Sequence, residues 1–435
     1  MIKRVFLLVF FIFSTNCSLD TKTGLWSESE DIKKENNPVI KEVFKDSEVL
    51  ERNFNENIKI NLKDEFKKNS FKNNLTNNNG YLNYYSNLDK ITKYKFSKID
   101  GFKFIQPDLL FNHDNSMVFF ENKGSIIKFN ENSKKIWKVN HYNKSEKKLN
   151  PTLFFASNNK FLVVADNISN YYLMDLISGE LLWKKNNASP FNSQVKIHKD
   201  KFFVIDLTNT LRCFSLKNGK ELWKFKSESP FINSQQKFSL IVKDKKIVFI
   251  NSLGDVTAVN IENGNLLWQT PTQSNSIYEN AFLLKNSDLV LEKNLIFFSN
   301  NKNQIFSLSL KNGSVLWKQN VNSNLRPTII GRLLFTVSYE GYLTILDSTN
   351  GNIIRITNVF DRIKDYKKNK IEPVGFIVAK NKIYLSLNNG KLITINITSG
   401  KSIDVIKIDG NKISRPYVLN KSMYLLKDNA ILKIN

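Results

Sequence analysis

Histidine, cysteine and clustered carboxylates are the side chains through which this chain could bind a metal or attack a substrate, and they are few. Metal-ligand spacing is absent among the three histidines, which are His113, His141 and His198. The two cysteines are Cys17 and Cys213, so no adjacent cysteine pair exists, and Cys213 is expected as a small buried apolar residue. No run of Asp, Glu and Asn has the spacing of a calcium loop. We therefore predict no metal site, no bound cofactor and no catalytic residues.

Cys17 lies just after an apolar run, and this position indicates its chemical role. Lys3 and Arg4 precede the nine apolar residues 5–13, and the small polar residues that follow end on Cys17. A basic start, an apolar stretch too short to span a bilayer and a small polar end are typical of a secretory signal peptide.

The end of this segment resembles the signal of bacterial lipoproteins, which are cut before a cysteine that receives a diacylglyceryl group. Asn16 stands where such signals usually have Gly, Ala or Ser, and Ser14 stands where they usually have Leu. An ordinary signal peptide that happens to contain a cysteine is the alternative. We predict that residues 1–16 are a lipoprotein signal peptide and that Cys17 is lipidated. Ser18 then indicates the outer membrane, with the protein facing the periplasm.

The composition indicates a large folded body with a basic surface. Hydrophobic residues make up 41% and aromatic residues 12% of the 435 residues, which is enough for a sizeable core, and 33 Phe and 14 Tyr favour β-structure. Lys and Arg number 64 against 40 Asp and Glu, which gives a formal charge of +24. The lysines are scattered among Asn and Ser, without a long basic run or a nucleic-acid motif. We interpret the charge as a solvated basic surface and predict no nucleic-acid partner.

The first part of the chain after the signal differs from the rest. Residues 18–64 carry 11 acidic and 8 basic residues and show little alternation of apolar and polar side chains. The excess of basic residues therefore lies in the remainder of the chain. We predict a flexible tether over residues 17–64 and a folded body over residues 65–435.

A repeated unit fills the chain from residue 117 onward. Each unit opens on a short apolar run, such as MVFF at 117 or FLVV at 161, and continues through a polar turn into further strand-like runs. The eight openings stand at residues 117, 161, 202, 247, 295, 333, 382 and 422. Repeats of roughly 40 to 50 residues with three or four strands are typical of propeller blades. We predict an all-β fold, an eight-bladed β-propeller of four-stranded antiparallel blades.

A glycine four residues before a tryptophan marks the end of several units. The glycines are Gly179, Gly219, Gly264 and Gly313, and the tryptophans are Trp183, Trp223, Trp268 and Trp317. A hairpin turn that needs a left-handed residue accepts glycine at little cost. The tryptophan then lies on the outer strand, where its ring can wedge between neighbouring blades while its N–H finds an acceptor. We interpret these residues, together with Trp137, as structural blade-docking residues and not as a catalytic signature.

The pattern changes at both ends of the repeat array. Ser133 stands where the first unit would have its glycine, and Arg355 and Asp404 stand where the sixth and seventh units would have tryptophan. We predict that those two blades lack the wedge. The eighth unit stops at Asn435 without an outer strand, and an open sheet edge is an aggregation hazard. We predict that an N-terminal strand near residues 65–79 closes the ring.

Units such as DLISGELLW, from Asp175, and NIENGNLLW, from Asn260, resemble the tryptophan-docked repeats of pyrroloquinoline-quinone-type propellers. The resemblance runs from about residue 80 to the end of the chain, and two families share it. Quinoprotein dehydrogenases hold a quinone with calcium on the central axis, in many members beside a disulfide between adjacent cysteines, which this chain cannot form. The BamB family of outer-membrane assembly factors consists of eight-bladed lipoproteins without catalytic residues. The lipoprotein signal, tether and eight units make this chain similar to the BamB family.

The resemblance implies a non-catalytic scaffold lipoprotein of the β-barrel assembly machinery, acting as a monomer within a hetero-complex. Its partners would be the periplasmic domain of the central barrel protein BamA and nascent outer-membrane proteins, whose insertion it would aid. In the family, loops around the fourth and fifth blades bind BamA, and the corresponding stretches here are residues 233–237 and 285–288. They lack the family's Arg and paired acidic residues, so Lys237 and Asp288 are the nearest candidates, with ordinary solvated loop residues as the alternative.

Two other functions stay open at this point. One is a periplasmic quinone-dependent oxidoreductase. The other is a general propeller adaptor at the outer membrane.

Overall fold

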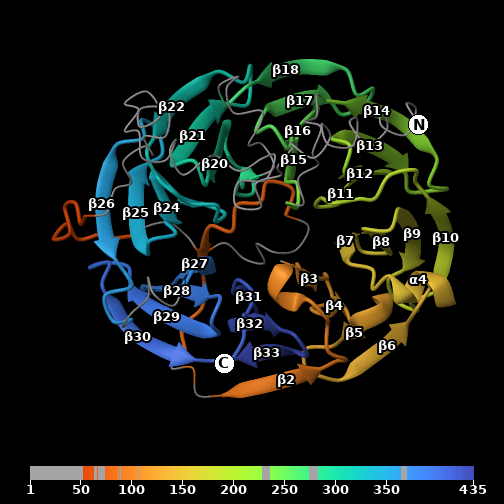
Figure 1. The fold of residues 1–435 in the computed structure, drawn as a ribbon, viewed down its shortest axis with the longest axis horizontal. Helices are drawn as coiled ribbons and strands as arrows, with labels where there is room; N and C mark the ends of the chain where they lie inside the picture. Colours follow the sequence, from red (N-terminus) through yellow and green to blue (C-terminus); the bar gives the residue numbers. More distant parts are fainter. Residues whose placement is uncertain are drawn as a thin grey trace, which may run out of the picture. The chain divides into compact units, whose positions relative to one another are not determined.

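Four-stranded antiparallel sheets repeat around a ring, as the sequence predicts (Figure 1). The computed structural model describes residues 52–62, 66, 74–86, 88, 90–105, 107–227, 236–273, 283–363 and 370–435. Within these residues the strands form eight sheets, and each sheet is one blade. The predicted signal peptide, Cys17 and most of the predicted tether lie outside the described residues.

Each of the first four blades runs from an inner strand at the central channel to an outer strand at the rim (Figure 1). Blade one comprises β3 (Leu110–Phe111), β4 (Met117–Phe120), β5 (Ile126–Phe129) and β6 (Lys135–Val139). Blade two comprises β7 (Leu153–Ser157), β8 (Phe161–Asp166), β9 (Asn170–Asp175) and β10 (Leu181–Asn186). Blade three comprises β11 (Lys196–His198), β12 (Lys201–Ile205), β13 (Thr210–Ser215) and β14 (Glu221–Lys226). Blade four comprises β15 (Leu240–Lys243), β16 (Lys246–Ile250), β17 (Val256–Asn260) and β18 (Leu266–Thr270).

The second half of the ring repeats this order, with one change in the last blade. Blade five comprises β19 (Val290–Glu292), β20 (Leu295–Asn300), β21 (Gln304–Ser309) and β22 (Val315–Gln319). Blade six comprises β23 (Thr328–Ile330), β24 (Leu333–Val337), β25 (Tyr342–Asp347) and β26 (Ile353–Asn358). Blade seven comprises β27 (Pro373–Ala379), β28 (Lys382–Leu387), β29 (Lys391–Asn396) and β30 (Ser402–Lys407), with the short β1 (Tyr81–Leu82) added in parallel to β27. Blade eight comprises β31 (Tyr417–Leu419), β32 (Ser422–Lys427), β33 (Ala430–Ile434) and, as its outer strand, β2 (Ile91–Lys95).

Helical segments are short in the described part of the chain. They are the 3-10 turns η2 (Phe102–Phe104) and η3 (Asn122–Gly124) and the α-helix α4 (Lys144–Lys148). Asn143 caps α4, because its side chain accepts from the Glu146 amide while the Glu146 carboxylate accepts from the Asn143 amide. No helix among the described residues is long and apolar enough to cross a bilayer.

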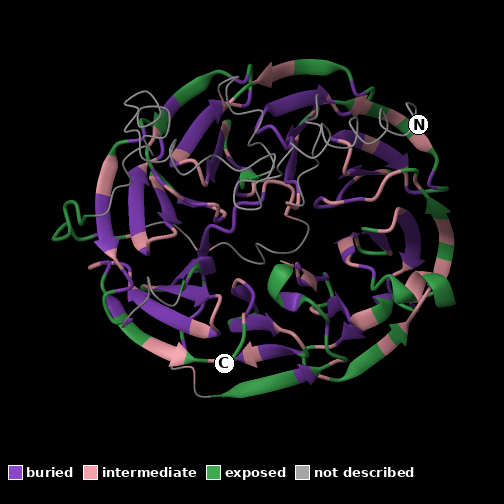
Figure 2. Ribbon diagram, in the orientation of Figure 1, coloured by how far each residue is buried: buried purple, intermediate pink, exposed green. Residues whose placement is uncertain are grey.

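The middle strands of each blade are apolar on both faces because each face packs on a neighbouring blade. Residues 202–205 of β12 are all fully buried, and β14 alternates between half-buried and exposed positions at the rim. Figure 2 shows the same gradient around the ring, with buried residues inside and exposed residues on the outer strands. Aromatic and β-branched residues suit such doubly covered strands, which explains the Phe-rich composition.

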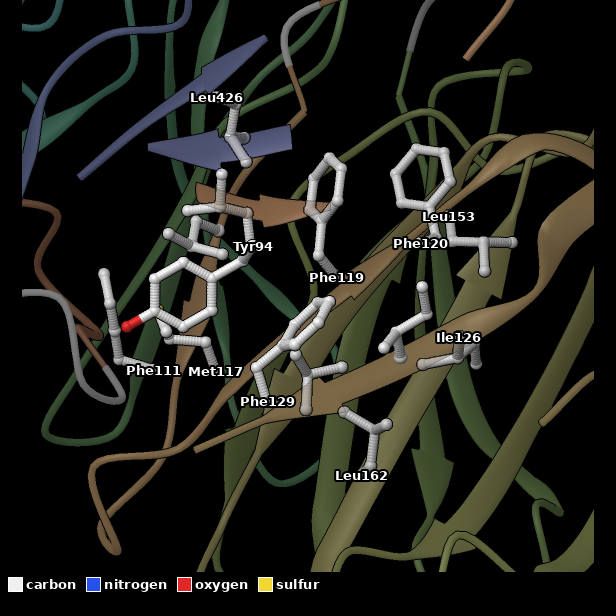
Figure 3. Packing of buried hydrophobic residues seen from close by; sticks show 14 of the residues in the cluster. Tyr94, Phe111, Met117, Phe119, Phe120, Ile126, Phe129, Leu153, Leu162 and Leu426 are labelled. Carbon is white, nitrogen blue, oxygen red and sulfur yellow. The ribbon is translucent and has the colours of Figure 1, made fainter. Parts of the chain in front are cut away.

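The hydrophobic core is a set of clusters that lie between blades. Figure 3 shows the cluster that joins blades eight, one and two, in which Tyr94, Phe119, Phe129, Leu162 and Leu426 are buried together. The blades therefore stabilise one another pairwise, and each interface depends on the side chains of both partners.

Each of the repeated tryptophans lies between two blades, where its ring covers the glycine of the following blade. The indole of Trp183 lies over Gly219, and its Nε1 donates to the Leu216 carbonyl at 3.0 Å. Trp137, Trp223, Trp268 and Trp317 repeat this arrangement on Gly179, Gly264, Gly313 and Gly351. These four glycines and Gly219 have left-handed backbones, with φ from 64 to 77°. The glycine thus supplies both a turn and a flat seat for the neighbouring indole.

The prediction that blade six lacks a wedge is wrong, because Arg355 takes the place of the indole. Its guanidinium covers Gly400 of blade seven, and Nη2 donates to the Ile397 carbonyl at 2.8 Å, in the manner of a tryptophan Nε1. Nη1 donates to the carbonyls of Thr398 and Ile58. Arg355 is fully buried and has no carboxylate partner within the part of the chain that the structure describes, and burial lowers its pKa to about 10. In blade seven, Asp404 is exposed, as expected for a blade without the wedge.

An N-terminal strand closes the ring, but the predicted segment, residues 65–79, is not that strand. The outer strand of blade eight is β2, whose residues from Ile91 to Lys95 pair antiparallel with β33. Tyr94 is 1% exposed, and its hydroxyl donates at 2.8 Å to the carbonyl of Glu131. Glu131 occupies the position in blade one that Leu176 occupies in blade two, where the Leu176 carbonyl accepts from Trp137. Tyr94 therefore performs the tryptophan's role at the closing interface. Ser133, with φ of 63°, occupies the glycine position of that turn.

The described end of the predicted tether is attached to the ring. Phe54 forms an antiparallel bridge with Ile356 of β26, and the Ile60 amide donates to the Thr398 carbonyl of blade seven at 3.1 Å. The Ile58 carbonyl accepts from Arg355, as described above. Residues 52–62 therefore bridge blades six and seven, so a free tether could extend only up to this stretch.

Candidate functional site

Lys237 and Asp288, the two residues singled out as possible partner contacts, belong to one charged cluster at the channel. We call this the channel cluster and define it as Asp108, Lys196, Lys237, Asp288, Arg326 and Arg415. Lys237 and Asp288 each keep a side-chain exposure of only 22%, so neither is an ordinary solvated loop residue. The structure does not bring either residue near the blade-docking tryptophans, which lie on the outer strands.

The repeat itself positions the members of the channel cluster. Asp108, Asp288, Arg326 and Arg415 each stand two residues before the inner strand of their blade, namely β3, β19, β23 and β31. Lys237 stands three residues before β15, and Lys196 opens β11. The inner strands converge on the channel, so equivalent positions from different blades meet there (Figure 1).

Ion pairs join these side chains across the ring. Asp288 accepts from Arg326 Nε at 2.7 Å and lies 3.5 Å from Arg415 Nη1. Asp108 accepts from Arg415 Nη2 at 2.5 Å and also from Lys237 Nζ. Each carboxylate thus bridges residues from two other blades. Buried pairs of this kind fix geometry, because separating one partner leaves the other charge unpaired.

The electrostatics of the cluster follow from burial and from mutual charge. Burial opposes ionisation of Asp108, but Lys237, Arg415 and Arg326 together hold the pKa of that carboxyl well below its ordinary value. Burial likewise opposes ionisation of Asp288, and Arg326 and Arg415 lower the pKa of its carboxyl. Both carboxylates are therefore charged at neutral pH.

Lys196 has no carboxylate partner among the described residues. Its ammonium donates to the Asn77 side-chain oxygen at 2.7 Å and to the Asn74 carbonyl. Burial and, to a lesser extent, the charge of Arg326 lower the pKa of Lys196 to about 7. The charge of this lysine therefore changes near neutral pH.

Residues 74–78 of the N-terminal segment lie along the inner strands and pair with them (Figure 1). The amides of Val242 and Leu291 donate at 2.9 Å to the carbonyls of Leu75 and Thr76. The Asn77 side-chain amide donates to the carbonyls of Leu240 in blade four and Leu289 in blade five. Residues 74–78 therefore connect blades three to six from the inside.

A cavity of about 100 Å³ lies beside this segment. Its polar wall contains Asp108, Lys196, Lys237, Arg326 and Arg415. Its apolar wall, from blades one and two, contains Leu110, Leu153, Phe154 and Phe155. The cavity thus places cations opposite aromatic rings.

The structure also shows the environment of Cys213 and of the possible metal ligands. Cys213 is fully buried, and burial raises its pKa to about 12, so its thiol is inert. Among the described residues, no group of three or more His, Cys, Asp and Glu could hold a metal ion. A quinone with calcium would need such donors, so the described residues do not fit that cofactor.

Sequence reasoning missed most of the channel cluster because its members carry no local motif. A signal did exist in the alignment of the repeats. Pro327 and Pro416 follow Arg326 and Arg415 at the same place before an inner strand. Comparing that position between units would have collected Asp108, Asp288, Arg326 and Arg415.

Comparison with known proteins agrees with this geometry. The sequence model described as "Outer membrane protein assembly factor BamB" matches residues 122–357. BamB from Moraxella catarrhalis superposes with a TM-score of 0.61 at 14% identity, covering 79% of this chain and 97% of that chain. Quinohemoprotein alcohol dehydrogenase from Comamonas testosteroni superposes with a TM-score of 0.60 at 8% identity, covering 81% and 78%. None of the curated proteins matches the chain.

The ring of blades locked by indoles over glycines defines an eight-bladed β-propeller with quinoprotein-like repeats. The solved structures share this fold, at identities too low to carry function. The family match spans more than half of the chain. The chain belongs to the BamB family.

Proposed function

We propose that this chain is a non-catalytic scaffold lipoprotein of the outer-membrane β-barrel assembly machinery. It docks on the central barrel protein BamA and aids the insertion of nascent outer-membrane proteins. Family membership over residues 122–357 is the observation that carries the proposal. The packing role of the repeated glycines and tryptophans supports it, because the most conspicuous residues of the sequence are used to build a rigid ring.

The channel mouth around Lys237 and Asp288 is the proposed docking face. Its charged side chains are held by ion pairs from several blades before any partner arrives. Side chains that are already ordered lose little conformational entropy on binding, so such a face suits a protein partner. Exposed Lys285, three residues before Asp288, extends the face toward solvent.

The quinone-dependent oxidoreductase has no observation in its favour beyond the shared fold. The general adaptor differs from our proposal only in its partners. Affinity purification separates these functions. The full chain, tagged at its C-terminus, would be extracted from envelopes in mild detergent and its co-purifying proteins identified by mass spectrometry. We expect the central barrel protein and its companion lipoproteins. An intact, well-expressed ring recovered only with unrelated partners would refute the proposal.

The proposed membrane anchor is the lipid on Cys17, and it gives a direct prediction. We expect Cys17→Ala to move the protein from the membrane fraction to the soluble fraction, because the acyl chains supply the membrane affinity. Immunoblotting of fractionated envelopes measures the shift. Cys213→Ala is the matched control, since this buried thiol cannot be acylated in the folded ring, and it should leave the fractionation unchanged. Membrane retention of Cys17→Ala at the wild-type level would contradict the lipid anchor.

A further inference from the structure

The channel cluster contains more positive than negative charge. Its four cations are Lys196, Lys237, Arg326 and Arg415, and its two carboxylates are Asp108 and Asp288. When Lys196 is protonated, two positive charges beside the cavity have no carboxylate of the cluster to balance them. Charges in a partly desolvated site are costly unless they are paired, so an anion that entered this cavity would be stabilised.

Each carboxylate oxygen of the cluster already accepts at least one hydrogen bond. Asp288 accepts a hydrogen bond from Gln194 on Oδ1 and one from Arg326 on Oδ2. Asp108 accepts a hydrogen bond from Arg415 on Oδ1 and one from Lys237 on Oδ2. An ammonium has three donors, and Lys237 gives one of them to Asp108. The cluster therefore has donors to offer a further oxyanion and few acceptors to offer a cation.

The opposite wall selects for an apolar group. Phe154 and Phe155 line the cavity, and the Lys237 ammonium lies 5.7 Å from the centre of the Phe154 ring. An anion with an aromatic or aliphatic body can place its charge on the cations and its body on these rings. A bare inorganic ion would leave the apolar wall unused.

We propose that this cavity is a binding site for a small organic carboxylate, with its carboxylate on Lys237, Arg415 and Lys196 and its apolar part on Phe154 and Phe155. This site goes beyond the proposed docking role and does not depend on it. Binding there would tie blades two, three, four and eight to a single ligand.

The site predicts a pH dependence through Lys196. The groups that face its ammonium are Asn74 and Asn77 of the N-terminal segment and the charged side chains of Asp108, Lys237, Asp288 and Arg326. The charge of Lys196 changes near neutral pH, because burial lowers its pKa to about 7. The lysine is charged below that pH and neutral above it, so carboxylate affinity should fall as the pH rises through 7.

Isothermal titration calorimetry on the full chain in mild detergent tests the proposal with benzoate as the probe. Benzamide has the same ring without charge, and inorganic phosphate has charge without the ring. We expect benzoate to bind, with weaker affinity at alkaline than at mildly acidic pH, and the two other probes to bind much more weakly or not at all.

Matched variants locate the binding. Lys237→Met should weaken the affinity for benzoate by about tenfold or more, since a hydrogen bond to a charged group is removed. Lys201→Met is the control, because Lys201 has a similar side-chain exposure of 18%, pairs with Glu262 and lies away from the cavity. Circular dichroism would confirm that both variants are folded.

Three outcomes would overturn the proposal. They are absence of benzoate binding to the folded chain, equal weakening by Lys201→Met, and binding of phosphate in preference to benzoate.

Discussion

Tyr94→Ala is expected to lower the free energy of unfolding by about 3 to 5 kcal/mol, the range for truncation of a fully buried aromatic side chain. Tyr94 is 1% exposed, and its ring meets Phe129 of blade one edge-on at 5.6 Å. Its hydroxyl also supplies the hydrogen bond to Glu131 that a tryptophan supplies elsewhere. Because β2 is the strand that joins the two ends of the chain into a ring, the loss concentrates at the closing interface.

Urea unfolding followed by tryptophan fluorescence measures this loss. Ile91→Ala in the same strand is the control, since Ile91 is 43% exposed and its truncation should cost far less. A Tyr94→Ala protein as stable as the Ile91→Ala protein would show that the ring is closed elsewhere.

Gly219→Ala is expected to lower the free energy of unfolding by about 2 to 5 kcal/mol. A Cβ at Gly219 would lie 2.7 Å from Cζ3 of Trp183, and this contact cannot be relieved by rotating a flexible side chain. Overpacking costs about 1 to 3 kcal/mol, and a left-handed backbone adds about 1 to 2 kcal/mol for a residue with a Cβ. The φ of Gly219 is 64°, so both costs apply.

Gly410→Ala is the matched control for this change. A Cβ at Gly410 would meet no atom within 4 Å, so its stability should stay within about 0.5 kcal/mol of the wild type. Both variants can be compared by the same urea unfolding experiment. If Gly219→Ala and Gly410→Ala were equally stable, indole-on-glycine packing would not be what joins the blades.

The blades could be predicted from the sequence because their signals are local. The glycine and tryptophan of each hairpin are four residues apart, and the polar residue before them acts within the same turn, where Asp175 accepts from the amides of Ile177 and Ser178. Which glycine each indole covers could not be predicted, because the contact joins residues of different units. Trp183, for example, reaches Gly219 and not its own Gly179.

The closing strand and the sixth wedge were missed for a different reason. Residues 91–95 form a short strand with no motif, and their partner β33 lies at the other end of the chain. Arg355 shares no obvious chemistry with tryptophan, yet its flat guanidinium and N–H donors fill the same seat. Sequence patterns record residue types, while these positions are decided by shape and by donor geometry.

The channel cluster shows the limit of prediction for the site. Lys237 and Asp288 were singled out from a resemblance, and their ion partners come from three other blades. Asp108 and Arg415 are separated by most of the folded chain but form one ion pair. Only the closed ring brings them together.

Site-specific photocrosslinking in living cells tests the central claim, that the channel mouth docks on the barrel assembly machinery. A photoreactive residue would replace exposed Lys285 beside the mouth, and in a second protein it would replace Leu222, which is 46% exposed on the outer rim. We predict a crosslink from position 285 to the central barrel protein and none from position 222. A folded, membrane-bound protein that crosslinks to that partner from neither position, or from the rim alone, would contradict the account.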